Sequence, residues 1–183
     1  MKLNKTHIED LFVIEPQIYG DHRGYFFESY NSKEFQQNGF QFNFIQDNEV
    51  KSSKGVLRGL HFQNPPYTQT KLIRSIFGEI LDVVVDLRTS SKTYGQHFSI
   101  HLNDTNKLQL LVPKGFAHGY IVLSKTAVVG YKVDEKYAPT YEDGIQWNDE
   151  TLHIDWILKE KEIILSEKDR QLKEFKNFKS PFV

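Results

Sequence analysis

Two histidines stand in short glycine-bearing segments that could position them for chemistry. His61 lies in Gly55-Val-Leu-Arg-Gly-Leu-His-Phe-Gln63, and His118 lies in Pro113-Lys-Gly-Phe-Ala-His-Gly119. An imidazole, with an ordinary pKa of about 6.5, can accept or donate a proton near neutral pH, and it is also a common metal ligand. A lone histidine is more often satisfied within a core. Two histidines in matched contexts favour a functional pair.

These two segments resemble the paired signature segments of a cupin, a small β-barrel that holds a reactive pocket. A metal-binding cupin normally carries His-x-His in the first segment, whereas here His61 is followed by Phe62 and Gln63. Two imidazoles alone rarely hold a transition metal tightly. Lys71 lies near the position expected for a carboxylate ligand, and a cation there repels a metal. The pattern therefore favours a metal-free barrel in which a histidine moves protons.

Lys71 and Tyr131 are candidates to assist His61. On a strand, Lys71 shares a face with Ile73, so it could lie inside a barrel and stabilise an enolate oxygen. The alternative for Lys71 and Arg74 is a solvated pair, the usual location of both residue types. Tyr131 could donate a proton if its hydroxyl faces a pocket, although a core position is more common.

Three further side chains lie outside the predicted strands. Asp169 could orient a histidine and stabilise its charged form, or it could serve only as the third residue of a capped helix. Tyr137 and Tyr141 flank Pro139 and could stack on a nucleobase, although packing is the commoner role.

Arg58 and His61 lie on the same predicted strand. Strand alternation places their side chains on opposite faces unless Gly59 forms a bulge, and a glycine within a strand often marks one.

The elements that must position these side chains are mostly short strands. Runs rich in β-branched residues, separated by turn signals, predict strands at 80–87, 96–102, 108–112, 119–123 and 127–133. Asp82 and Asp86 are an even number of positions apart and are expected on one face. Because no long helices separate the strands, we predict an antiparallel barrel or sandwich.

Two helices are predicted beside the strands. The first covers residues 32–38, with Asn31 or Ser32 as its cap and Gly39 as its stop. The second covers residues 166–175 and begins with Ser-x-x-Asp, a weak capping signal.

The composition is that of a folded domain. The chain has 183 residues, of which 39% are hydrophobic and 14% aromatic, so it can build a core. A net charge of -1 gives no basic footprint for nucleic acid, and the absence of cysteine excludes disulfides and thiolate chemistry. No signal segment or membrane span is evident, so we expect a cytoplasmic location. We expect one domain over residues 1–183, with a peripheral charged tail from about residue 173.

In combination, the motifs resemble the dTDP-4-dehydrorhamnose 3,5-epimerase family. Besides the two histidine segments, the matching stretches are Asp21-His-Arg-Gly-Tyr-Phe-Phe-Glu28, Gln46-Asp-Asn48, Phe77-Gly-Glu-Ile-Leu-Asp-Val-Val-Val-Asp-Leu-Arg88, Trp147-Asn-Asp149 and Leu165-Ser-Glu-Lys-Asp169. The resemblance extends over nearly the whole chain. It implies an all-β fold, a cupin-type antiparallel jelly-roll β-barrel with short flanking helices, without metal or cofactor.

This resemblance also implies a reaction and roles for individual residues. The reaction inverts C3 and C5 of dTDP-4-dehydro-6-deoxy-D-glucose through enolate intermediates, giving dTDP-4-dehydro-L-rhamnose for dTDP-rhamnose biosynthesis. By position, the catalytic residues are the base His61, its partner Asp169, the proton donor Tyr131, and Lys71 beside the keto oxygen. The positions matched to substrate binding are Arg23, Glu28, Gln46, Asn48, Arg58, His118, Tyr137, Glu142 and Lys168, with Tyr137 stacking on the thymine. In the implied homodimer, segment 23–28 reaches the pocket of the neighbouring subunit.

The chain departs from the family pattern at two places. Glu49 and Val50 follow Asn48 where many members carry a histidine or cysteine and a serine, and no proline follows Asp169. Three alternatives fit part of the pattern: a metal-dependent cupin enzyme, a non-catalytic sugar-binding module, and an epimerase acting at C3 alone. The sequence is compatible with single or double epimerisation, with thymidine or another base, with more than one downstream sugar, and with assembly beyond a dimer.

Overall fold

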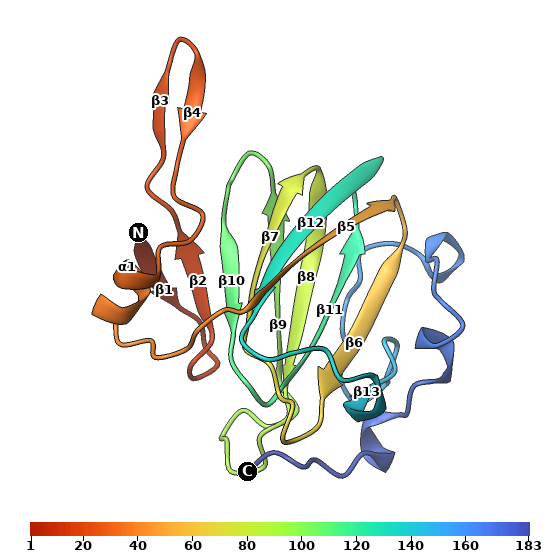
Figure 1. Ribbon diagram of the computed structural model, residues 1–183. Coiled ribbons are helices and arrows are strands. Elements are labelled where there is room, and N and C mark those ends of the chain that lie inside the picture. The colour runs from red at the N-terminus through yellow and green to blue at the C-terminus, as the bar shows by residue number, and fades with distance from the viewer.

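The computed structural model describes residues 1–183 and consists of two antiparallel sheets packed face to face (Figure 1). The first sheet has the order β1-β2-β10-β7-β12-β5, with β1 Lys2–Lys5, β2 Phe12–Glu15, β10 Gln109–Val112, β7 Lys71–Phe77, β12 Thr126–Val133 and β5 Gln46–Ser53. The second has the order β13-β6-β11-β8-β9, with β13 Glu142–Gly144, β6 Leu57–Gln63, β11 Phe116–Val122, β8 Glu79–Asp86 and β9 His97–Asn103. This architecture confirms the predicted all-β jelly roll.

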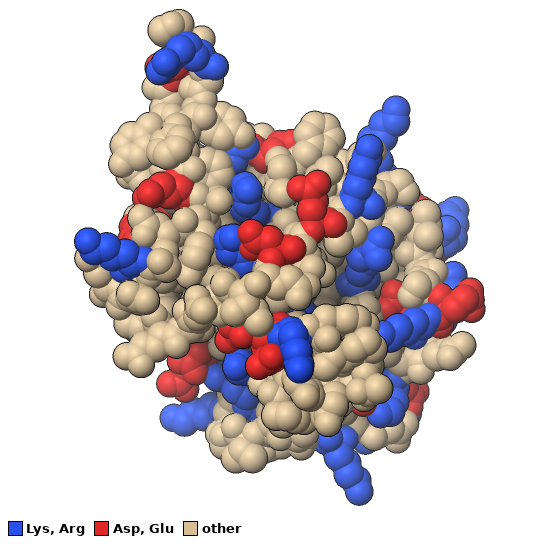
Figure 2. All heavy atoms as spheres, viewed as in Figure 1, with Lys and Arg blue, Asp and Glu red and all other residues tan.

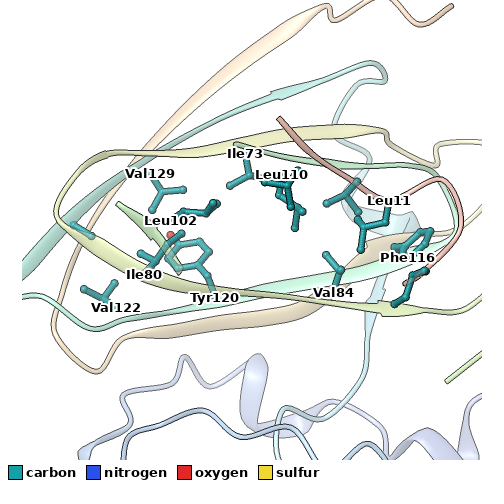
Figure 3. Packing of buried hydrophobic residues seen from close by; sticks show 14 residues of the cluster. Leu11, Ile73, Ile80, Val84, Leu102, Leu110, Phe116, Tyr120, Val122 and Val129 are labelled. Carbon is teal, nitrogen blue, oxygen red and sulfur yellow. The ribbon is translucent and has the colours of Figure 1, made fainter. Parts of the chain in front are cut away.

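The space between the sheets is filled by a cluster of 14 buried residues. Figure 3 shows their side chains pointing inward from both layers. Strand alternation explains which residues belong to the cluster. On β8, Ile80 and Val84 are members, whereas Val83 faces the opposite side of the sheet. Asp82 and Asp86 share the parity of Ile80, as their spacing predicts, and both are fully buried.

A second buried cluster lies on the outer face of the five-stranded sheet, beneath the C-terminal part of the chain. It includes Trp147, Trp156 and Phe182. The C-terminal segment from Lys173 was expected at the periphery, but Phe182 is only 7% exposed and packs against Phe62 of β6. The end of the chain therefore contributes to the core, because the outer face of this sheet is apolar and needs a cover.

Of the two predicted helices, the first is confirmed. Helix α1 spans Ser32–Gln37, and the Asn31 side chain accepts hydrogen bonds from the backbone of Lys33 and Glu34. The remaining helical turns are short 3-10 segments, η1 Pro139–Tyr141, η2 Glu160–Glu162, η3 Asp169–Gln171 and η4 Phe175–Asn177.

The predicted helix at residues 166–175 is wrong, since only η3 and the start of η4 lie there. The backbone of this segment bonds elsewhere: the carbonyl of Lys173 accepts from the amide of Gln146, and the amide of Phe175 donates to Asp149. These tertiary hydrogen bonds replace those that an α-helix would make.

One hairpin projects from the body of the molecule (Figure 1). It consists of β3 Tyr19–Asp21 and β4 Gly24–Phe26. Its aromatic side chains Tyr19, Tyr25 and Phe26 are 62%, 59% and 65% exposed, which is unusual for side chains of this size.

On the face seen in Figure 2, acidic and basic side chains are interspersed and form no large patch of one charge. No helix of the structure has the length and apolar character needed to cross a membrane.

Candidate active site

A cavity of about 350 Å³ is lined by most of the predicted site residues. Its walls come from β5, β6, β7, β11, β12 and β13, from the segment that precedes η1, and from the segment that leads into η3. The predicted residues brought together are Arg58, His61, Lys71, His118, Tyr131, Tyr137, Glu142, Lys168 and Asp169.

Four predicted binding residues lie outside this cavity. Gln46 and Asn48 lie on β5, where the Gln46 amide donates to the Asn48 side chain at 2.8 Å. Asn48 lines an adjacent depression that shares Tyr131 with the cavity. Arg23 lies in the hairpin turn and pairs with Asp21 at 2.5 Å. Glu28 follows the hairpin and accepts a hydrogen bond from Asn31.

A bulge in β6 turns Arg58 and His61 toward the same cavity, as the position of Gly59 predicted. His61 faces His118 across the β6–β11 ladder and Arg58 faces Tyr120, so the register shifts between these two pairs. Gly59 has a φ of +132°, a conformation that side chains other than glycine rarely adopt. The extra residue overrides strict alternation.

His61 and Asp169 form a close pair at one wall of the cavity. His61 Nε2 lies 2.5 Å from Asp169 Oδ1, and the Asp169 side chain is 4% exposed. Burial raises the pKa of Asp169, but hydrogen bonds from His61 and Ser166 outweigh it, so the pKa lies below its usual value. Asp169 is therefore ionised near neutral pH and can stabilise a protonated His61. Since Nε2 contacts the carboxylate, Nδ1 is the nitrogen left to take a proton from a bound molecule.

Tyr131 and Lys71 belong to the opposite sheet. In the β12–β7 register Lys71 faces Val133, so Tyr131 is its diagonal neighbour on the same face. Burial lowers the pKa of Lys71 to about 8, against the attraction of Glu142 and Asp82. Burial also raises the pKa of Tyr131, with Arg58 opposing and Glu142 reinforcing the shift. At neutral pH the cavity thus holds an ammonium group beside a neutral phenol.

Tyr137, Glu142 and Lys168 form a network at the rim. The Tyr137 hydroxyl donates to Glu142 Oε2 at 2.5 Å, and Lys168 Nζ lies 2.5 Å from the same oxygen. Hydrogen bonding to Glu142, together with burial, raises the pKa of Tyr137 to about 12. The Tyr137 residue is 53% exposed, so part of its surface is free for stacking. Tyr141 instead packs edge-on against Tyr67, which favours its structural interpretation.

Sequence reasoning missed two residues that line the cavity, Tyr120 and Ser166, and one partner of a lining residue, Asp82. Asp82 is fully buried, and its Oδ2 lies 2.9 Å from His118 Nε2. Its Oδ1 has no hydrogen-bond partner. Tyr120 lines the cavity with a buried, unpartnered hydroxyl, and Ser166 contacts Asp169. Strand alternation could have identified two of these residues. It places Asp82 on the inward face of its strand, and it places Tyr120 on the same face as His118, two residues before it.

The fold and the site together define a class of protein. A jelly-roll barrel with a carboxylate-bound histidine on one sheet, and a phenol and an ammonium group on the other, is an acid–base enzyme of cupin architecture.

Comparison with known proteins identifies the family. The profile described as dTDP-4-dehydrorhamnose 3,5-epimerase matches residues 5–177. The dTDP-4-dehydrorhamnose 3,5-epimerase of Methanothermobacter thermautotrophicus is 49% identical over 170 residues, covering 92% of this chain and 91% of the relative.

Comparison with solved structures identifies the same family. The crystal structure of dTDP-4-dehydrorhamnose 3,5-epimerase from Elizabethkingia anophelis superposes with a TM-score of 0.93 at 48% identity, covering 97% of both chains. A Legionella pneumophila dTDP-6-deoxy-D-glucose-3,5-epimerase, solved in complex with dTDP-4-keto-L-rhamnose, gives a TM-score of 0.93 at 44% identity, covering 97% of this chain and 94% of that one. The chain belongs to the dTDP-4-dehydrorhamnose 3,5-epimerase family and is an isomerase.

Proposed function

We propose that the protein inverts C3 and C5 of dTDP-4-dehydro-6-deoxy-D-glucose, giving dTDP-4-dehydro-L-rhamnose in the cytoplasmic biosynthesis of dTDP-rhamnose. The observation that carries the proposal is the placement of His61 and Tyr131 on opposite sheets around one cavity, with Asp169 behind His61. Inversion at carbon requires a base on one face and an acid on the other, and this cavity offers both.

The chemistry follows from the 4-keto group, which acidifies the hydrogens on C3 and C5. His61 Nδ1 takes the proton, and the electron pair of the broken C–H bond moves to the C4 oxygen as an enolate. The Lys71 ammonium stabilises this negative charge. Tyr131 returns a proton to carbon from the opposite face, and the carbonyl reforms. Exchange with solvent then restores neutral His61 and the Tyr131 phenol, and the same cycle serves the second carbon.

Residues at the rim of the cavity can bind the nucleotide part of the substrate. The guanidinium of Arg58 and the ammonium of Lys168 line the cavity and can bind a diphosphate. Tyr137 offers an exposed ring for the base. Substrate binding then exchanges the contact between Lys168 and Glu142 for one with the diphosphate.

Proton NMR of the purified protein in D2O with dTDP-4-dehydro-6-deoxy-D-glucose tests this function. We expect deuterium at both C3 and C5, because each carbanion is reprotonated by a group in exchange with solvent. Deuterium at C3 alone would make the protein a monoepimerase. No exchange with nucleotide-sugar binding retained would reject proton transfer in favour of a binding module, and exchange abolished by chelators would favour a metal-dependent cupin.

We also propose that the active enzyme is a homodimer in which the β3–β4 hairpin completes the site of its neighbour. Arg23 and Glu28, matched to substrate binding in the family, do not line the cavity of their own chain. The hairpin projects away from the body with three exposed aromatic side chains, which suits insertion against a second copy.

Mixing two defective variants tests this arrangement. We expect Arg23→Ala to weaken turnover of its homodimer about tenfold or more, since a charge-assisted contact to substrate is lost. After mixing with inactive His61→Asn, hybrid dimers contain one site with both residues intact, so activity should rise above that of either variant. The activity is measured after unfolding and refolding the two variants together. Activity equal to the mean of the separate variants would contradict the shared site.

A further inference from the structure

Ser166 holds the Asp169 carboxylate by two hydrogen bonds. Its hydroxyl donates to Asp169 Oδ2 at 2.8 Å, and its oxygen accepts from the Asp169 amide at 3.1 Å. The other carboxylate oxygen, Oδ1, contacts His61 Nε2. His61 and Ser166 are the two side chains that hydrogen-bond to this carboxylate, so each oxygen has one partner.

The Ser166-x-x-Asp169 spacing does not cap an α-helix. The turn η3 covers only Asp169–Gln171, and the chain becomes extended at Leu172. The serine therefore closes a local turn, whose effect is to fix the carboxylate. The final torsion of an aspartate side chain is broad, so a carboxylate held at one oxygen alone can rotate. A donor on the second oxygen removes that freedom.

Building on the function proposed above, we propose that Ser166 is a positioning residue for the epimerisation. Its hydroxyl fixes the plane of the Asp169 carboxylate, and it also draws negative charge away from the oxygen that faces His61. The carboxylate then orients His61 and supports the imidazolium, while remaining too weak a base to remove its proton. Ser166, Asp169 and His61 are thus linked by consecutive hydrogen bonds, and His61 contacts the substrate.

The hydrogen bonds to Asp169 are consistent with this role. Burial raises the pKa of Asp169, while the hydrogen bond from His61 and then that from Ser166 lower it. The other ionisable groups around the pair are Arg58 on β6, Lys71 on β7, His118 and Tyr120 on β11, Tyr131 on β12, Tyr137 before η1, Glu142 on β13 and Lys168 before η3. None of these hydrogen-bonds to Ser166, so replacing its hydroxyl leaves their contacts in place.

Ser166→Ala and Ser166→Thr test the proposal together. We expect Ser166→Ala to lower kcat about 10- to 100-fold through misplacement of the base, with a smaller change in KM. Ser166→Thr keeps the hydroxyl and should restore kcat.

A matched control is Ser91→Ala. Ser91 donates to Asp86, another buried carboxylate, at 2.6 Å, but it does not line the cavity. Its loss should leave both kcat and KM unchanged.

The outcomes separate this inference from the proposed function. Wild-type protein without deuterium exchange contradicts the function, whereas wild-type exchange with an unchanged kcat in Ser166→Ala overturns only the role of Ser166. If Ser166→Ala is poorly folded, Ser166→Thr decides: near-normal kcat supports the proposal, and a loss despite the retained hydroxyl overturns it.

Discussion

Replacement of His61 by asparagine is expected to lower kcat about 10,000-fold, the upper range for loss of a general base. An asparagine amide can still contact Asp169 but cannot accept a proton from carbon. The side chain of His61 is only partly buried, at 25% exposed, so the fold should survive the change. The measurement is deuterium entry at C3 and C5, with dTDP affinity determined by calorimetry to show that binding is retained.

The matched control is His101→Asn on β9. His101 also pairs with a carboxylate, Glu79 at 2.7 Å, but lies at the surface away from the cavity. This variant should turn over at the wild-type rate. If His61→Asn retained a kcat within tenfold of wild type, the assignment of His61 as the base would be wrong.

Replacement of Lys71 by methionine is expected to lower kcat about 100- to 1,000-fold, the range for loss of one group that stabilises an anionic transition state. Methionine preserves much of the side-chain length without the charge. Burial lowers the pKa of Lys71 to about 8. Because the ammonium is the active form, wild-type kcat should be full below this pH and decline as pH rises through about 8. The measurement is kcat from neutral to alkaline pH.

In Lys71→Met the alkaline limb near pH 8 should be absent, since the group that titrates there is gone. Lys92→Met, an exposed lysine outside the cavity, serves as the control and should retain both kcat and the limb. An alkaline limb that persists in Lys71→Met would belong to a different group.

The sequence was most informative where local rules decide the structure. Alternating β-branched residues predicted β8 and the strands after it, and Asn31 predicted the start of α1. The predicted inward face of Lys71 and the predicted bulge at Gly59 were also confirmed, because strand geometry and glycine conformation are local properties. These rules predicted the barrel and the direction of several cavity side chains.

Long-range contacts explain what the sequence did not predict. The helix expected after Ser166 does not form, since Lys173 and Phe175 bond to a distant part of the chain. The partnership of Asp82 with His118 depends on the pairing of β8 with β11, which no local pattern specifies. Arg23 was recognised only through family resemblance, because a hairpin that projects from its own chain gives no local indication of what it contacts.

The pairing of His61 with Asp169 joins positions 108 residues apart, and this separation has a consequence for synthesis of the protein. The ribosome synthesises every strand of the barrel before it reaches Ser166 and Asp169. Until then His61 lacks its carboxylate, and the outer face of the five-stranded sheet lacks its C-terminal cover. Catalytic competence therefore arrives only with the last part of translation, and a chain terminated before Ser166 would lack both the partner of its base and part of its core.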